Sequence, residues 1–198
     1  MSFLVNNCAL YALDQKTIES CAPFSCGHDD LDDFFNNDTH NYSLQLLGKS
    51  YCFRLNKDTD VIVCAFTVSN SSIKIDGLPN RGRKIKNAIP REKQLRNYPA
   101  VLIGRLGVST NFIGKGIGSE LMDFIKLWFV TQNKTGCRFV LVDAYNTPKT
   151  IKYYQDNGFD FIFSSEKTEK DYYHIKGDDL KTRSMYFDLI RLTHSPRD

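Results

Sequence analysis

The 198-residue chain has no apolar run near the roughly 20 residues that a transmembrane helix needs. Its first residues, Met-Ser-Phe-Leu-Val-Asn-Asn-Cys, lack both the basic start and the apolar core of a signal peptide. We therefore expect a cytoplasmic protein with no membrane contact. The chain is long enough to bury a sizeable core and short for two domains, so we expect a single domain over residues 1–198.

The six cysteines lack the spacing of a metal site or a redox motif. None forms a Cys-x-x-Cys pair, and the four histidines do not fall at zinc-ligand spacings. The nearest approach to a cluster is Cys21, Cys26 and His28. We expect reduced, mostly buried thiols and no metal.

An excess of charge of one sign is also missing, since the formal net charge is only +3. The charges are unevenly placed, with seven basic residues and one acid in residues 81–96 and four aspartates in residues 29–33. The acidic run suits the first turn of a helix that Ser25 or Asp29 could cap. The basic run is either a solvated loop or a surface for a polyanion.

The hydrophobic pattern changes in the middle of the chain, which predicts an antiparallel section followed by a βαβαβ section. A long loop is expected over residues 71–99, which contain three prolines. The other expected elements are a strand at 8–13, a helix at 29–42, a hairpin from 50–55 and 60–69, a strand at 100–108 interrupted by Arg105, a helix from 117, a strand at 139–142, a short helix ended by Asn157-Gly158, and strands at 159–163 and 183–192.

Three glycines at alternating positions, Gly114, Gly116 and Gly118, lie between the expected strand and the expected helix. Such a turn carries few side chains, so its backbone N–H groups can converge on an anion. The helix that follows adds its own unpaired N–H groups and the positive end of its dipole. The segment therefore predicts a phosphate-binding turn.

The spacing of this turn excludes two nucleotide-binding motifs. A P-loop has Lys-Ser or Lys-Thr after its last glycine, whereas Lys115 lies between the glycines. A dinucleotide fingerprint needs a third glycine where this chain has Ser119. A turn without a ligand would need only one or two glycines.

The segment Arg-Leu-Gly-Val-Ser-Thr-Asn-Phe-Ile-Gly-Lys-Gly-Ile-Gly-Ser-Glu-Leu-Met, residues 105–122, resembles motif A of the GNAT superfamily of N-acetyltransferases. The usual pattern is [QR]-x-x-G-x-[GA], and Ile113 stands here where the family has Gln or Arg. The resemblance implies acetyl-CoA as cosubstrate, with its pyrophosphate held largely by backbone N–H groups. The implied cofactor-binding residues of the turn are Ile113, Gly114, Lys115, Gly116, Ile117, Gly118 and Ser119.

A second segment, Val-Asp-Ala-Tyr-Asn-Thr-Pro-Lys-Thr-Ile-Lys-Tyr-Tyr-Gln-Asp-Asn-Gly-Phe at 142–159, resembles the strand–Asn–helix–Tyr-x-x-x-Gly-Phe segment of the same family. The match implies that Asn146 contacts the cofactor. It also implies that Tyr154 is the catalytic acid that protonates the leaving thiolate. The alternative for Tyr154 is a packing role under the sheet.

The resemblance further implies a single α+β domain with a mostly antiparallel twisted sheet, flanking helices and a splayed parallel strand pair. The backbone of Leu106, Gly107 and Val108 would then pair with pantetheine like an added strand. The general base is not visible, because residues 100–108 contain no carboxylate. A water chain, a residue of the loop 71–99 and an amine that arrives neutral all stay open.

The N-terminal half resembles one branch of the superfamily. Residues 23–35, Pro-Phe-Ser-Cys-Gly-His-Asp-Asp-Leu-Asp-Asp-Phe-Phe, match F-x-C-G-x-x-x-L-D-x-F of a branch that includes toxins acetylating the amino group of aminoacyl-tRNA. Arg-Leu-Gly-Val at 105–108 and Val-Asp-Ala at 142–144 also resemble that branch. The resemblance implies tRNA, bound through the basic residues 81–96, and a small antitoxin protein as partners.

Three functions remain open at this point. The first is an N-acetyltransferase acting on a primary amine of a small molecule or a protein. The second is a toxin-like enzyme acting on aminoacyl-tRNA. The third, motivated by Ile113 and the missing base, is a non-catalytic acetyl-CoA-binding module. A homodimer could form through the last expected strand.

Overall fold

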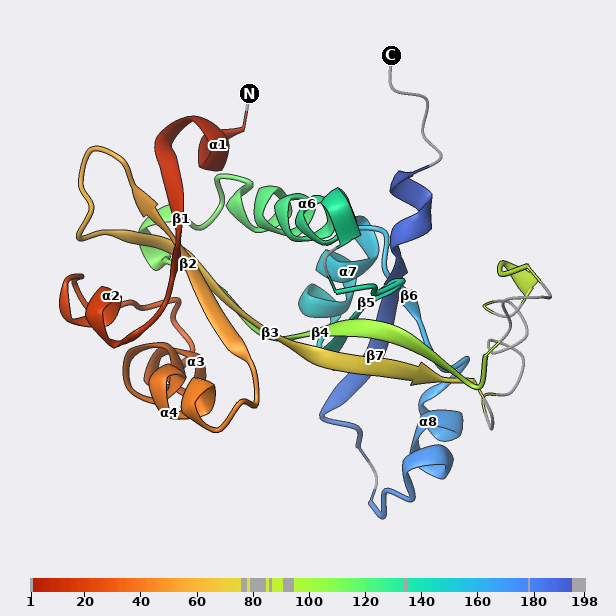
Figure 1. Cartoon of the computed structure of the whole chain (residues 1–198). Helices are drawn as coiled ribbons and strands as arrows, with labels where there is room; N and C mark the ends of the chain where they lie inside the picture. Colours follow the sequence, from red (N-terminus) through yellow and green to blue (C-terminus); the bar gives the residue numbers. More distant parts are fainter. Residues whose placement is uncertain are drawn as a thin grey trace. The chain divides into compact units, whose positions relative to one another are not determined.

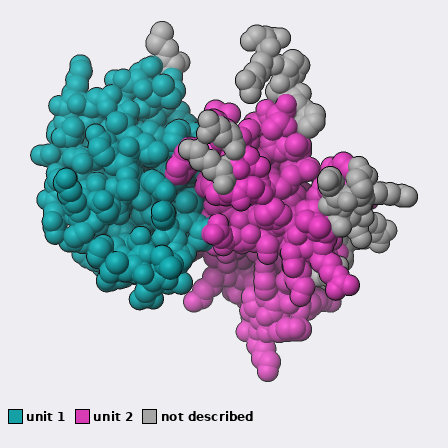
Figure 2. All heavy atoms as spheres, in the orientation of Figure 1, with its two compact units in different colours: residues 1–69, 103–125 teal, residues 70–102, 126–198 magenta. Residues whose placement is uncertain are grey.

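The computed structural model of the chain describes residues 2–75, 78, 85, 87–90, 95–133, 135–177 and 179–193. The chain divides into two compact units (Figure 2). Unit 1 comprises residues 1–69 and 103–125, and unit 2 comprises residues 70–102 and 126–198. No helix within the described ranges is long and apolar enough to cross a membrane.

The strands of the described chain form one sheet in the order β1-β2-β3-β4-β5-β7-β6 (Figure 1). Its pairs are mostly antiparallel, and β4 and β5 form the parallel pair. The predicted α+β fold with flanking helices is therefore confirmed. The strands are β1 (Cys8–Ala12), β2 (Lys49–Leu55), β3 (Ile62–Lys74), β4 (Asn97–Val108), β5 (Phe139–Tyr145), β6 (Asp160–Phe161) and β7 (Thr182–Asp188).

Short helices and turns connect these strands (Figure 1). The predicted helix at 29–42 is present as an α-helix, a π-helical segment and a second α-helix in succession. The helical elements are α1 (Phe3–Asn7), α2 (Gln15–Glu19), α3 (Asp29–Asp33), the π-helical η1 (Phe34–Asp38), α4 (Thr39–Leu44), η3 (Thr110–Phe112), α6 (Ile117–Val130), η4 (Thr131–Asn133), α7 (Pro148–Asp156), α8 (Glu166–Tyr173) and η5 (Leu189–Leu192).

In unit 1, β2 pairs antiparallel with both β1 and β3, so the predicted hairpin is confirmed. Apolar side chains of the helical segment 29–44 pack toward these strands, and Phe35 is only 1% exposed. Because alternate residues of a strand face opposite sides, the side chains of Cys52 and Ile62 can join this layer. The buried cluster consists of Leu13, Phe24, Phe34, Phe35, Cys52, Ile62 and Ala65.

The predicted helix cap at Ser25 or Asp29 is wrong. The residue before α3 is His28, whose side chain makes no capping hydrogen bond. Instead the carboxylate of Asp32 reaches back from the helix and accepts from Ser25 Oγ and from the Cys26 N–H, both at 2.7 Å. A carboxylate in the first turn can satisfy such donors as well as a preceding side chain can, as in the second half of a capping box.

In unit 2, β7 lies between β5 and β6 and pairs antiparallel with both. The final strand therefore has neighbours on two sides, and the homodimer stays a prediction. The strand expected at 183–192 ends at Asp188, whose side chain accepts from Ile190 N and starts η5. The strand expected at 159–163 is reduced to β6.

The loop predicted over residues 71–99 is shorter than expected. Strand β3 continues to Lys74 and β4 begins at Asn97, so both extend into this range. The N–H of Ile75 donates to the Arg96 carbonyl at 2.9 Å, which extends the pairing by one residue. The remaining six residues of the basic run, Arg81, Arg83, Lys84, Lys86, Arg91 and Lys93, lie outside the described residues.

Helix α7 follows the local signals of its sequence. Thr147 caps its N-terminus by accepting from Thr150 N, and Pro148 occupies the first turn. The helix ends at Asn157 and at Gly158, which has φ of 82°, as predicted.

Helix α8 was not predicted, because its sequence is polar almost throughout. Its position depends on Glu169, which is 2% exposed and accepts from Arg183 Nε and from the Ser184 N–H, both at 2.7 Å. Buried charges persist only when they are paired and hydrogen-bonded, and here both conditions hold. This interaction fixes α8 against β7.

Candidate functional site

The glycine turn between η3 and α6 contains two left-handed residues. Gly114 has φ of 79° and Gly116 has φ of 77°, a region that residues with a Cβ rarely adopt. A Cβ built on either glycine would have no heavy atom within 4 Å. The conformation, rather than crowding by the protein, therefore requires glycine, and the space above the turn is open.

The backbone donors of this turn are available to a ligand. The N–H groups of Gly114, Lys115, Gly116 and Ile117 have no acceptor within the part of the chain that the structure describes. Helix α6 begins here, with Ser119 N and Glu120 N donating to the Gly116 carbonyl at 3.1 and 3.2 Å. The side chain of Ile117, 1% exposed, anchors this end of the helix in unit 1.

The acid in the first turn of α6 does not compete for these donors. Glu120 accepts instead from Ser2 Oγ and from Leu4 N, both at 2.9 Å. Burial alone would raise the pKa of Glu120, but the N–H groups of Leu4 and Phe3 bring its pKa below the ordinary value. The Glu120 carboxylate therefore binds donors at the N-terminus of α1.

One side chain of the turn differs from the usual family pattern, and another carries a positive charge. Ile113 is 58% exposed and offers no polar group where Gln or Arg is usual. Lys115 is exposed, and its Nζ donates to the Asn111 carbonyl at 3.1 Å and lies 5.1 Å from the centre of the Phe112 ring. Lys115 thus supplies the cation of this turn.

The end of β4 in unit 1 is held by the segment that resembles the toxin branch. A Cβ on Gly107 would lie 3.1 Å from Cys26 Sγ and 3.2 Å from the Phe24 ring, so a side chain there would push the segment away. The N–H of Thr110 donates to the Ser25 carbonyl at 2.9 Å. Segment 24–26 is therefore packed directly against Leu106–Val108.

Helix α3 and η1 hold this segment in place. Asn36 accepts from Phe24 N and donates to the Phe24 carbonyl, both at 2.8 Å, beside the Asp32 contacts described above. Burial, reinforced by Asp32, raises the pKa of the Cys26 thiol to about 12. This thiol is therefore protonated at neutral pH and has a packing role.

Arg105, which interrupts the apolar pattern of β4, stacks on aromatic rings of unit 1. Its guanidinium carbon lies 3.6 Å from the centre of the Phe34 ring and 5.4 Å from that of Tyr42. Cation–π contact explains why a charged residue is tolerated in the strand.

In unit 2, Tyr154 lies on α7 between two other aromatic rings. Its ring centre is 5.0 Å from that of Tyr153 and 5.5 Å from that of Phe159. Burial, and then the charge of Asp143, raises the pKa of Tyr154 to about 12. The phenol therefore keeps its proton at neutral pH, as a proton donor must.

Asn146 follows β5 and joins it to the loop before β7. Its N–H donates to the Lys181 carbonyl at 2.9 Å, and its Nδ2 donates to the Leu180 carbonyl at 3.0 Å. One of the two N–H donors of the side-chain amide is therefore used within the protein. The Oδ1 atom, which can accept a hydrogen bond, has no such bond among the described contacts of Asn146.

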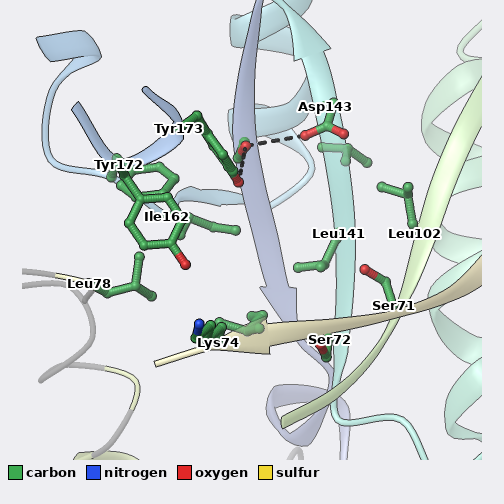
Figure 3. A pocket seen from close by; sticks show the side chains of 14 residues that line it. Ser71, Ser72, Lys74, Leu78, Leu102, Leu141, Asp143, Ile162, Tyr172 and Tyr173 are labelled. Atoms are coloured by element: carbon green, nitrogen blue, oxygen red, sulfur yellow. Dashed lines mark hydrogen bonds between the residues drawn. The ribbon is translucent and has the colours of Figure 1, made fainter. Parts of the chain in front are cut away.

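A carboxylate that the sequence reasoning missed lies on β5. Ser184 Oγ donates to Asp143 Oδ1 at 3.2 Å, and the Tyr173 hydroxyl lies 3.4 Å from Ser184 Oγ (Figure 3). Partial burial of the Asp143 carboxyl raises its pKa, against the hydrogen bond from Ser184 and with help from Glu169. The sequence signal for this carboxylate is Val-Asp-Ala at 142–144, which resembles the toxin branch.

The described residues contain no group of three or more His, Cys, Asp or Glu side chains that could hold a metal ion. All six cysteines are free, and four of them are buried. Burial raises the pKa of Cys8 to about 11 and that of Cys52 to about 12. These thiols are unreactive at neutral pH.

Comparison with known proteins agrees with this geometry. Residues 84–160 match the family model described as an acetyltransferase (GNAT) domain. No curated protein matches the chain.

Several solved structures of toxin acetyltransferases share the fold. AtaT in complex with acetyl-methionyl-tRNAfMet is 17% identical, with a TM-score of 0.68 over 94% of this chain and 98% of that chain. A mutant of KacT is 16% identical, with a TM-score of 0.68 over 95% and 98%. A mutant AtaT toxin bound to the C-terminus of the antitoxin AtaR and acetyl-CoA is 15% identical, with a TM-score of 0.56 over 96% and 100%.

These findings confirm the predicted resemblance to the GNAT superfamily and to its toxin branch. Residues 84–160 thus match an acetyltransferase (GNAT) domain model, and the chain has the fold of the toxin structures above.

Proposed function

We propose that residues 1–198 form one N-acetyltransferase domain that acetylates the amino group of aminoacyl-tRNA. The observation that carries the acetyltransferase part is the turn at Gly114 and Gly116, where left-handed backbone leaves N–H groups without acceptors among the described residues. Open space above both glycines and the N-terminus of α6 fit a pyrophosphate.

Each predicted site residue has a distinct part in this proposal. The turn residues Ile113, Gly114, Lys115, Gly116, Ile117, Gly118 and Ser119 hold the pyrophosphate, mainly through their backbone. The backbone of Leu106, Gly107 and Val108 pairs with pantetheine, and an N–H at or next to Val108 stabilises the developing oxyanion. Asn146 accepts a hydrogen bond through Oδ1.

When bound, acetyl-CoA supplies the acetyl group as a thioester. Tyr154 holds a proton on its phenol oxygen and donates it to the departing thiolate sulfur. Burial supports this role, because it keeps the phenol protonated well above the pH of the cell.

The acceptor is proposed from segment 24–26. The residues that resemble the tRNA-acetylating branch are packed on the end of β4 at Gly107 and Thr110. Similarity to toxin structures over 94% to 96% of the chain, one of them AtaT in complex with acetyl-methionyl-tRNAfMet, supports aminoacyl-tRNA as the acceptor. We propose on these grounds that the protein binds tRNA through residues 81–96 and is neutralised by a small antitoxin.

A second candidate acceptor is the amine of a small molecule or a protein. The net charge of +3 favours it, because enzymes that bind a polyanion usually carry a stronger basic excess.

Alanine at Gly116 tests the phosphate-binding turn. The substitution Gly116→Ala strains a left-handed residue and displaces the N–H groups, so we expect KM for acetyl-CoA to rise about tenfold or more, the worth of a hydrogen bond to a charged group. Gly136→Ala is the matched control, because Gly136 has φ of 65° and equally open surroundings but lies away from the turn. Equal KM values for the two variants would contradict a role in cofactor binding.

Removal of one hydroxyl tests the catalytic acid. We expect Tyr154→Phe to lower kcat by about 10²- to 10⁴-fold with little change in KM for acetyl-CoA, because only proton donation is lost. Tyr153→Phe removes the neighbouring hydroxyl and should leave kcat within about twofold. With a pKa of about 12, Tyr154 should also cause no fall in the wild-type rate near pH 10. Full turnover of Tyr154→Phe at saturating acetyl-CoA would show that another group donates the proton.

Thiol release from acetyl-CoA distinguishes the two acceptors. The assay compares aminoacyl-tRNAs with the same tRNAs after deacylation, and with a panel of amines and lysine-containing peptides. We expect release with aminoacyl-tRNA alone, and a log affinity for tRNA that falls by about 0.7–0.9 per log unit of salt for each phosphate contacted.

Charge reversal provides the control for that assay. Reversal of Arg83, Lys84 and Lys86 should weaken tRNA binding and flatten the salt dependence, whereas reversal of the exposed Lys16, Lys57 and Lys167 should not. Release with small amines or peptides only would establish the second candidate, and release with none would contradict both.

A further inference from the structure

A cavity of about 270 Å³ lies wholly within unit 2, next to β5, the strand that carries Asp143 (Figure 3). It is bounded by the end of β3, by β4, β5 and β7, and by α8. This volume is just below the roughly 300–1,000 Å³ of pockets that hold drug-sized ligands. The cavity therefore suits a group the size of one amino acid.

The polar end of the cavity is Asp143. It lies opposite Ser184 in the β5–β7 register and accepts from Ser184 Oγ at 3.2 Å. Ser184 is itself held through its N–H by the buried Glu169, which also binds Arg183. The cation nearest to Asp143 along β7 is thus already paired.

No ion pair to Asp143 occurs in the part of the chain that the structure describes. The side chain reaches solvent, yet partial burial and the charge of Glu169 raise its pKa. A cationic group arriving at this carboxylate would relieve both effects. Asp143 therefore favours a ligand with a positive charge at this end.

Apolar side chains line part of the cavity, together with hydroxyl groups of serine and tyrosine residues, and a cation lies at its other end. Leu102, Leu141 and Ile162 line its wall. Lys74 lines the end away from Asp143, and Figure 3 shows the two charged side chains well apart. A ligand with one ammonium group and an uncharged, apolar substituent fits this arrangement, whereas a second cation would meet Lys74.

The charge of Asp143 acts on the proposed acid. It contributes to the raised pKa of Tyr154, and both residues belong to unit 2. The carboxylate end of the cavity is therefore the end nearest the chemistry.

We propose that this cavity is the acceptor subsite, in which Asp143, oriented by Ser184, binds the α-ammonium group of an acceptor with an apolar side chain and removes its proton. The inference rests on the proposed N-acetyltransferase function and names the substrate class. An α-ammonium group loses its proton near pH 8, about two pH units below a lysine side chain, so a carboxylate base suits it better.

The proton balance of this step is complete. The ammonium N–H bond breaks and its proton goes to Asp143, which later releases it to solvent. The free amine then forms the N–C bond as the C–S bond breaks, and the sulfur takes the Tyr154 proton. The second proton lost by the nitrogen restores Tyr154.

The test measures amine binding separately from transfer, using phenylalanine methyl ester and lysine methyl ester as probes. We expect Asp143→Asn to weaken binding of the phenylalanine ester about tenfold or more, since a hydrogen bond to a charged group is lost. Asparagine keeps an oxygen for Ser184, so the fold is preserved. Asp171→Asn, at an exposed position of α8, is the control and should leave binding unchanged.

A second variant tests the other end of the cavity. Lys74→Glu should raise the affinity for the lysine ester relative to the phenylalanine ester, because it replaces repulsion with attraction. Unchanged ester affinity in Asp143→Asn, an unchanged ratio of the two affinities in Lys74→Glu, or no binding of either ester to the wild-type protein would each overturn the proposal.

The source of the α-amine is settled by the last arm of the test. The assay compares acetyl transfer to phenylalanyl-tRNA with transfer to the phenylalanine ester. If Asp143→Asn lowers both rates by the same factor, both substrates use the proposed subsite. Loss of thiol release in the wild-type protein would refute the acetyltransferase proposal, whereas unaltered ester binding in Asp143→Asn would refute only this subsite.

Discussion

Left-handed backbone at Gly114 and Gly116 is the constraint on which this account depends. The N–H groups at and beside these glycines have no acceptor within the described chain. Unpaired backbone donors cost free energy unless water or a ligand satisfies them. An anion does so with charge assistance, and the N-terminus of α6 adds the field of its dipole. The local conformation of a strand-to-helix turn thus connects the fold to the chemistry.

The second half of the chain places titratable groups by a different device. The buried pair of Glu169 and Arg183 fixes α8 and the Ser184 backbone on β7. Ser184 is then in register to meet Asp143 on β5. Tyr154, whose pKa is raised to about 12, completes a set in which one group holds a proton and another can accept one. Environments that separate the behaviour of titratable groups in this way are typical of acid–base catalysis.

Features encoded by local physics could be predicted from the sequence. The glycine spacing predicted the turn before α6, and Asn157-Gly158 predicted the end of α7, because both depend on conformations that few residues adopt. Features that depend on partners distant in the chain could not. Helix α8 has a polar sequence and is fixed by the buried contact of Glu169 with Arg183. At α3, Asp32 inside the helix binds the preceding backbone, where a capping side chain before the helix was expected. The role proposed for Asp143 required the β5–β7 register, which no local pattern contains.

Amide hydrogen exchange of the turn, with and without acetyl-CoA, tests the central claim most directly. If the N–H groups of Gly114, Lys115, Gly116 and Ile117 bind the pyrophosphate, saturating acetyl-CoA should slow their exchange about tenfold or more, as expected for charge-assisted hydrogen bonds. The amide of Gly136, which already donates to the Asn133 carbonyl at 3.0 Å, should not change and serves as the internal reference. Unchanged exchange at all four turn amides under saturating acetyl-CoA would contradict the account.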